Sequence, residues 1–223
     1  QIGGLGFMSA ASLGFLVLRK KIGLKHRLVM AQALSLNDMD GVVRLQKWVL
    51  LGSLIIQLTG AVILFLRFLP EQGIGTALKW SVFHSVSAFC NAGFDILGTG
   101  QSVATLNHDP VVMFTLMGLI VVGGLGFFVW EELARVKSFK KFSVYTKLVL
   151  LTSGVLLLGG GVLFLILEWD NPATLGAMEP GDKVLNAFFQ SVTLRTAGFA
   201  SIDQGALTDA GKAVSLVFML IGG

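Results

Sequence analysis

The sequence SVSAFCNAGF at residues 85–94 returns as SVTLRTAGF at residues 191–199, one residue shorter in the second copy. Each copy closes a mixed apolar and polar segment, 77–89 or 183–194. As a helix, such a segment would reach only roughly 20 Å, too short to cross a bilayer. The segments are therefore either helices on the membrane surface or re-entrant helices that enter the membrane and return. Irregular backbone at membrane depth persists only when buried in protein or lining water, so the re-entrant interpretation implies a pore or cavity.

Longer apolar segments lie on both sides of these copies. A spanning helix needs about 20 mostly apolar residues, because the hydrocarbon core is about 30 Å thick. By that measure the expected spans are 2–18, 49–69, 111–130, 148–167 and the beginning of one at 213–223. The chain begins at Gln1 inside one apolar run and stops at Gly223 inside another, so we expect an internal piece of a longer membrane protein.

The composition excludes several classes of protein. Of 223 residues, 54% are apolar and 13% are charged, whereas a soluble domain carries about 25% charged residues. So few charges cannot cover a water-facing surface, which excludes a soluble enzyme or nucleic-acid binder. Cys90 is the single cysteine, which excludes an internal disulfide and a Cys-rich metal site. No aspartate lies in a full span, and no Ser–His or metal-binding set occurs at helical spacing, so we expect no enzyme.

The net charge of +4 is distributed unevenly. Seven Lys and Arg residues lie between 19 and 47 and five between 135 and 147, whereas 70–110 holds Lys79 alone. The positive-inside rule therefore predicts cytoplasmic basic loops and short segments on the outer side. These loops serve topology alone, or they also dock a cytoplasmic partner or anionic lipid.

A second motif repeats in step with the first. GGLGF at residues 3–7 returns at 123–127, and residues 218–223 resemble the opening of a third copy. The order of segments predicts units of helix, pore loop and helix, all in one orientation, which an axis along the membrane normal would relate. The fold class expected is therefore an all-α membrane protein whose repeated units form a pseudo-symmetric ion-conducting pore.

We expect three parts in this chain. Residues 1–44 would hold the inner helix of repeat 1 and a cytoplasmic loop. Residues 45–144 would form repeat 2, with a helix, a pore loop, a helix and a cytoplasmic loop. Residues 145–223 would form repeat 3, with a helix, a pore loop and a truncated inner helix.

The Ala-Gly-Phe stretch in each copy suits a cation filter. Such a filter replaces the ion's hydration shell with backbone carbonyls, glycine permits the dihedral angles this needs, and the preceding helix directs its partly negative end toward the ion. We expect the pore to be lined by the main-chain oxygens of Asn91, Ala92, Gly93, Thr196, Ala197 and Gly198. Phe94 and Phe199 would wedge the loops against their scaffold. A plain turn is the alternative, and the second copy weakens it.

Several other residues each admit more than one role. The Gly-Gly-x-Gly clusters lie in membrane spans, which favours close helix packing over nucleotide binding. Asp95 and Asp203 are either ordinary solvated acids or attract cations at the mouth. Arg195 is costly in a membrane if unpaired, so a buried ion pair or a backbone carbonyl contact is favoured over a role in permeation. His84 is expected to hydrogen-bond locally, and Cys90 to pack beside the filter.

These loops resemble the pore loops of the Trk/Ktr/HKT superfamily of potassium transporters, and more specifically those of Ktr-type membrane subunits. Residues 87–95 look like the second pore loop of that family and residues 191–199 like the third. Gly93 and Gly198 match the family's selectivity glycines. The resemblance covers essentially the whole chain and leaves the first and fourth filter loops outside it.

The resemblance implies uptake of potassium across the plasma (inner) membrane, with sodium as a coupling or activating ion and no cofactor. Sodium or non-selective cation transport is the alternative. Phe94, Phe199 and Arg195 are expected as filter support, and three scattered histidines predict no transition-metal site. The expected partners are a second copy of the full-length subunit, a cytoplasmic nucleotide-binding regulatory ring and the lipid bilayer, with no nucleic acid.

Overall fold

The structure is a computed structural model that describes residues 42–98, 100–136, 138–195 and 197–222, with side chains from residue 48 onward. The chain divides into two compact units, residues 1–56 and 57–223, and the contacts described below lie within the second. In the described part all regular secondary structure is helical. The expected span at 2–18, the first GGLGF motif and most of the first basic loop lie outside the described residues.

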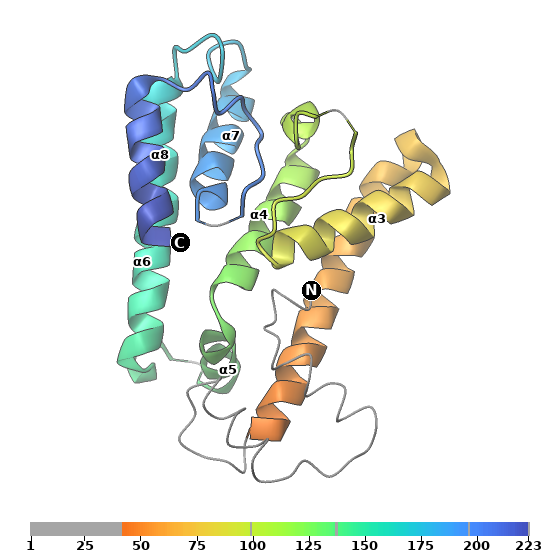
Figure 1. The fold of residues 1–223 in the computed structure, drawn as a ribbon. Helices are drawn as coiled ribbons and strands as arrows, with labels where there is room; N and C mark the ends of the chain where they lie inside the picture. Colours follow the sequence, from red (N-terminus) through yellow and green to blue (C-terminus); the bar gives the residue numbers. More distant parts are fainter. Residues whose placement is uncertain (1–41, 99, 137, 196, 223) are drawn as a thin grey trace. The chain divides into compact units, whose positions relative to one another are not determined.

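Helix α3, Val42–Phe89, is two helices joined at a kink. Gly73 has φ 71° and ψ 163° there, a left-handed φ that glycine adopts without steric cost, and Pro70 disrupts helical hydrogen bonding just before it. The chain turns back on itself at this point (Figure 1). The part before Gly73 contains the predicted span at 49–69, and the part after it, the returning part of α3, contains the predicted short segment 77–89.

The next apolar segment, in which a span is expected at 111–130, is not one continuous helix. It forms α4, Pro110–Gly124, and α5, Phe127–Arg135, bent by 95° relative to each other. The break lies at Leu125–Gly126, where Gly126 has φ 83°. The glycines of the second GGLGF motif thus end one helix and start another, which corrects the expected continuous helix.

Helix α4 begins at a cap that the sequence supplies. The Asp109 Oδ1 accepts hydrogen bonds from the amides of Val111 at 3.0 Å and Val112 at 3.2 Å. Pro110 occupies the first turn, where its missing N–H costs nothing. An acidic N-cap also complements the positive end of the helix dipole.

The remaining helices are α6, Val144–Glu168, α7, Pro180–Thr193, and α8, Asp209–Gly222. They confirm the predicted span at 148–167 and the short helix at 183–194. By length and composition, Trp48–Phe89 and Val144–Glu168 are candidate membrane spans among the described residues, and α4 with α5 is a third if the bent pair counts as one. Two short 3₁₀ turns, Ala104–Leu106 and Phe139–Lys141, lie in the connections.

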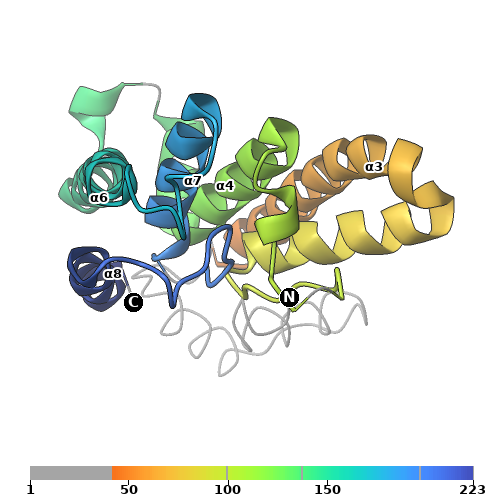
Figure 2. The same cartoon turned by 90° about the horizontal axis from the view of Figure 1, so that it is seen from above.

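Helix α7 contacts α6 on one side and α4 on the other, as Figure 2 shows from above. An apolar core joins α6, α7, α8 and the loops between them. Its buried members are Phe164, Leu175, Ala187, Leu194, Ile202, Leu207 and Phe218. Because α7 also buries the polar residues Asn186, Gln190 and Ser191, this short helix is enclosed by protein, as a re-entrant helix must be.

Candidate functional site

Two loops follow the two short helices, and their backbones share an unusual conformation. Loop A comprises residues 90–95 and loop B residues 195–200. Gly93 in loop A has φ 68°, Gly198 in loop B has φ 82°, and Asn91 has φ 50°. Glycine takes such angles at no steric cost and Asn tolerates them better than most residues. Both predicted filter glycines therefore occupy positions whose left-handed φ angles favour glycine.

One hydroxyl residue at the end of each short helix makes two hydrogen bonds to the loop that follows it. We call this pair of bonds the hydroxyl clasp. The Ser87 carbonyl accepts from the Ala92 amide at 2.9 Å, and the Ser87 hydroxyl donates to the Phe94 carbonyl at 2.8 Å. Thr193 repeats both contacts in loop B: its carbonyl accepts from the Ala197 amide at 3.0 Å, and its hydroxyl donates to the Phe199 carbonyl at 2.7 Å.

No role for Ser87 or Thr193 was predicted from the sequence. The signal was present, because both copies carry a hydroxyl residue at this place. The clasp engages the carbonyl after each glycine. Among the backbone hydrogen bonds of the described residues, none ends on the carbonyl oxygens of Ala92, Gly93 or Ala197.

The two loops meet at their glycines. A Cβ built on Gly93 would overlap the carbonyl oxygen of Ala197 and lie 2.8 Å from the carbonyl carbon and Cα of Gly198. A Cβ on Gly198 would lie 3.6 Å from the Gly93 Cα. The structure therefore brings together two residues that are far apart in sequence, and Gly93 has no room for a side chain.

The other predicted site residues differ in their surroundings. Phe199 is 1% exposed, whereas Phe94 is 70% exposed. Arg195 is half-buried at the end of α7, and Thr196 lies outside the described residues. The carboxylates of Asp95 and Asp203 accept hydrogen bonds from nearby amides of their own loops, Leu97 at 3.2 Å and Gly205 at 2.8 Å. Across the described residues, no three His, Cys, Asp or Glu side chains gather as a metal site.

Close packing of helix α4 on loop A uses the second GGLGF motif. A Cβ on Gly123 would overlap the carbonyl oxygen of Phe89, and one on Gly124 would lie 3.1 Å from the end of the Asn91 side-chain amide. With its amide oriented to donate, Asn91 reaches the carbonyls of Ala88 at 3.2 Å and Ile120 at 3.3 Å. The predicted packing role of these glycines is confirmed for this copy.

The short helices are tied to the helices before them in matching ways. The Ser85 hydroxyl donates to the Gln57 carbonyl at 2.6 Å, and the Ser191 hydroxyl donates to the Leu156 carbonyl at 2.9 Å. A glycine allows each approach. A Cβ on Gly60 would lie 3.0 Å from the Ser85 hydroxyl, and one on Gly160 would overlap the Ser191 hydroxyl.

The start of the helix after each loop is held by a charged residue of the long helix before the loop. The Arg67 Nε lies 2.5 Å from the Asp109 Oδ2, so the cap of α4 is an ion pair. At α8 the acid belongs to the preceding long helix, α6. The Glu168 Oε1 accepts hydrogen bonds from the Thr208 amide at 3.0 Å and from the Thr208 hydroxyl at 2.7 Å, directly before α8 begins. No role for Asp109 or Glu168 was predicted from the sequence.

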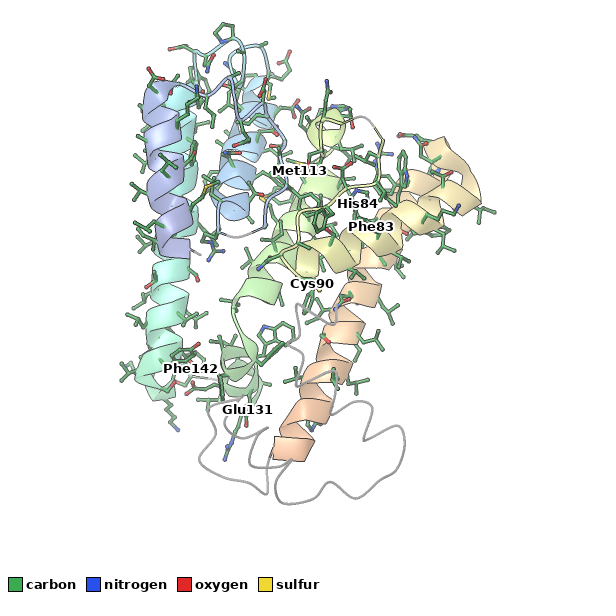
Figure 3. The ribbon with its side chains drawn as sticks, viewed as in Figure 1. Phe83, His84, Cys90, Met113, Glu131 and Phe142 are labelled. Carbon is green, nitrogen blue, oxygen red and sulfur yellow. The ribbon has the colours of Figure 1, made fainter. Side chains whose placement is uncertain are left out.

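His84 makes the local hydrogen bond that the sequence analysis expected, between its Nδ1 and the Trp80 carbonyl at 2.7 Å. Its ring also stacks on Phe199 of loop B. Figure 3 shows His84, Phe83 and Cys90 along the returning part of α3. Cys90, half-buried, directly follows the last residue of that helix.

Comparison with known proteins agrees with this architecture. The family model TrkH, described as "Cation transport protein", matches residues 1–223. The chain is 41% identical to the potassium/sodium uptake protein NtpJ of Enterococcus hirae over 223 residues, which are 100% of this chain and 49% of that protein. It is 41% and 38% identical to the Ktr system potassium uptake protein B of Bacillus subtilis and of Vibrio alginolyticus, again over 100% of this chain and 49% of each relative. The chain thus spans about half the length of these curated relatives. With a match over its whole length, the chain belongs to the TrkH family of cation transport proteins.

Proposed function

We propose that the full-length protein takes up potassium across the plasma membrane, and that loops A and B supply two parts of its selectivity filter. The observation that carries this proposal is the meeting of Gly93 with Gly198, each at a left-handed φ and each beside the same hydroxyl clasp. Two loops of equal construction that converge on one place suit a ring of ligands better than two unrelated turns. The relatives named as potassium uptake proteins support the choice of ion.

The potassium ligands in this proposal are main-chain oxygens. They belong to Asn91, Ala92, Gly93, Thr196, Ala197 and Gly198. Carbonyl rings can replace the hydration shell of a monovalent cation, and the carboxyl ends of the two short helices add their partial negative charge at the same place. Phe94, Phe199 and Arg195 act as filter support.

Sodium or non-selective cation transport is the second candidate. It is favoured by the printed name of the Enterococcus hirae relative, which includes both potassium and sodium. The architecture would be the same in either case. Competition between the two ions in an uptake assay separates the candidates.

The same proposal covers orientation and partners. Arg135 at the end of α5 and Lys140 and Lys141 in the 3₁₀ turn before α6 are exposed, which agrees with a cytoplasmic basic loop. Two relatives are named as parts of a Ktr system, which agrees with a regulatory partner. We propose a cytoplasmic nucleotide-binding ring in that role and a homodimer of the full-length subunit, with pore loops on the outer side.

The test is Gly198→Ser in the full-length protein, expressed in a strain that lacks its own potassium uptake. A side chain at φ 82° strains loop B, so we expect weaker preference for potassium over sodium in an uptake competition assay. Gly154→Ser is the matched control, because a Cβ there would meet nothing within 4 Å. Unchanged potassium uptake and ion preference in Gly198→Ser would contradict the proposal.

A further inference from the structure

His84 is a buried ring whose orientation is fixed from within its own helix. The residue is 2% exposed. Its Nδ1 lies 2.7 Å from the Trp80 carbonyl, and because a carbonyl only accepts, the Nδ1 carries the hydrogen. This bond holds the plane of the imidazole while one face remains for contact with another segment.

That segment is loop B. The ring centroids of His84 and Phe199 lie 6.4 Å apart with an interplanar angle of 29°, within the range of offset-stacked aromatic pairs. Phe199 is 1% exposed and directly follows Gly198. A ring on the short helix of one repeat therefore packs against the residue next to the filter glycine of the other repeat.

Two further contacts from repeat 2, which contains His84, hold the same stretch of loop B. The Ala200 amide donates to the Ser102 hydroxyl at 3.1 Å, and the Val103 amide donates to the Ala200 carbonyl at 3.1 Å. Loop B's own repeat adds the Thr193 hydroxyl on the Phe199 carbonyl at 2.7 Å. The Phe199 ring is thus held by His84, its carbonyl by Thr193, and the backbone of the next residue, Ala200, by Ser102 and Val103.

The matching place in the other short helix does something different. In the alignment of the two copies, Gln190 corresponds to His84. Gln190 pairs with Gln204 through two hydrogen bonds of 2.6 and 3.0 Å, so it ties its helix to the outer loop of its own repeat. His84 instead contacts Phe199 in the other repeat. This difference indicates that His84 has a role that Gln190 does not share.

We infer that His84 is a positioning residue for loop B: its ring holds Phe199, which sets the direction of the Gly198 carbonyl and so the discrimination between potassium and sodium. The inference rests on the proposed function of loop B as part of a filter. His84 itself touches no ion. Selectivity depends on the positions of the carbonyl oxygens. If loop B loses its contact with His84, its carbonyl oxygens can occupy a wider range of positions.

The test compares His84→Ala with His84→Phe in the full-length protein. We measure rubidium uptake and its inhibition by sodium in cells lacking other potassium uptake, at equal amounts of protein in the membrane. Losing one stacked pair should lower the preference for potassium by about threefold to tenfold in His84→Ala. His84→Phe keeps an aromatic face on Phe199 and should stay close to the wild type, as should the control Val82→Ala, whose side chain is 46% exposed on the same helix.

Wild-type discrimination in His84→Ala would overturn the inference, and so would equal damage in His84→Phe and His84→Ala. If His84→Ala reaches the membrane poorly, His84→Gln poses the same question, because Gln190 already occupies the matching place in the other short helix. The double variant His84→Ala/Phe199→Leu adds a second criterion: a loss no greater than that of the single variants supports the contact, and independent losses contradict it. A wild type that accumulates no potassium would overturn the proposed function as well, a result distinct from a selective wild type with an unaffected His84→Ala.

Discussion

Loops A and B are clasped by the same hydrogen bonds, but the helices that follow them are anchored by opposite charges. At α4 the guanidinium of Arg67 binds the carboxylate of Asp109, which in turn caps the helix. At α8 the carboxylate of Glu168 binds the amide and hydroxyl of Thr208. Beside loop A the acid stands at the start of the helix that follows the loop, whereas beside loop B it stands at the end of α6, before α7 and its loop.

The two anchors also differ in burial. The Arg67 side chain is 36% exposed, whereas Glu168 is fully buried and also accepts hydrogen bonds from Asn171 at 2.7 Å and Thr174 at 2.8 Å. The comparison teaches that loop conformation tolerates little variation, since it depends on backbone dihedral angles. Attachment of the next helix tolerates much more, since any complementary pair of groups at the right distance achieves it.

The largest expected effect concerns the two glycines, which appear equivalent in sequence but not in space. A Cβ on Gly93 would overlap backbone atoms that cannot move aside, whereas one on Gly198 would have 3.6 Å to the nearest atom outside its own loop. Gly93→Ala should therefore reduce rubidium uptake about tenfold or more, and Gly198→Ala less, since its cost is mainly the left-handed φ at about 1–2 kcal/mol. Equal losses, or a greater loss in Gly198→Ala, would show that the loops do not meet as described. Gly154→Ala serves as the control.

The next prediction compares how much the Arg67–Asp109 contact and the Glu168–Thr208 contact stabilise the full-length protein. Glu168→Gln keeps the shape of the side chain but directs amide hydrogens at groups that already donate, so the unfolding free energy should fall by about 3 kcal/mol. Arg67→Gln should cost less, because its partly exposed ion pair is screened by solvent. The apparent unfolding temperature in detergent measures both. A larger drop for Arg67→Gln would reverse the ranking drawn from burial.

The smallest effect tests whether the two clasps are equivalent. Thr193→Val and Ser87→Ala each remove one hydroxyl that donates to a carbonyl, a contribution of about 1 kcal/mol, and each should lower the preference for potassium over sodium several-fold. Thr193→Ser restores the donor and should retain wild-type preference in the same competition assay. Loss of preference in Thr193→Ser as well would mean that the methyl group, rather than the hydrogen bond, holds loop B.

Much of this architecture could be predicted from one sequence because it depends on local composition. Apolar length predicted the spans at 49–69 and 148–167, and the repeated Ala-Gly-Phe predicted two loops after short helices. The predicted span at 111–130 was wrong as a single helix, because a run of apolar residues does not reveal that Gly126 takes φ 83° and redirects the chain. Hydropathy indicates which residues are apolar enough to lie in lipid, but it does not indicate where the chain changes direction.

The residues that hold the loops could not be predicted in the same way. Nothing in the sequence connects Glu168 with Thr208 or His84 with Phe199, since these pairs form only when helices far apart in the chain pack together. Their partners are selected by distance in space, whereas a motif records distance along the chain.

Sequence alone therefore established the class of protein, the order of helices and the two glycines, because hydrophobic length and the freedom of glycine at positive φ are properties of short segments. Tertiary structure decided that the two loops converge, that Gly93 has no room for a side chain, and that opposite charges anchor α4 and α8. These are consequences of close packing, where a contact depends on the positions of two segments at once.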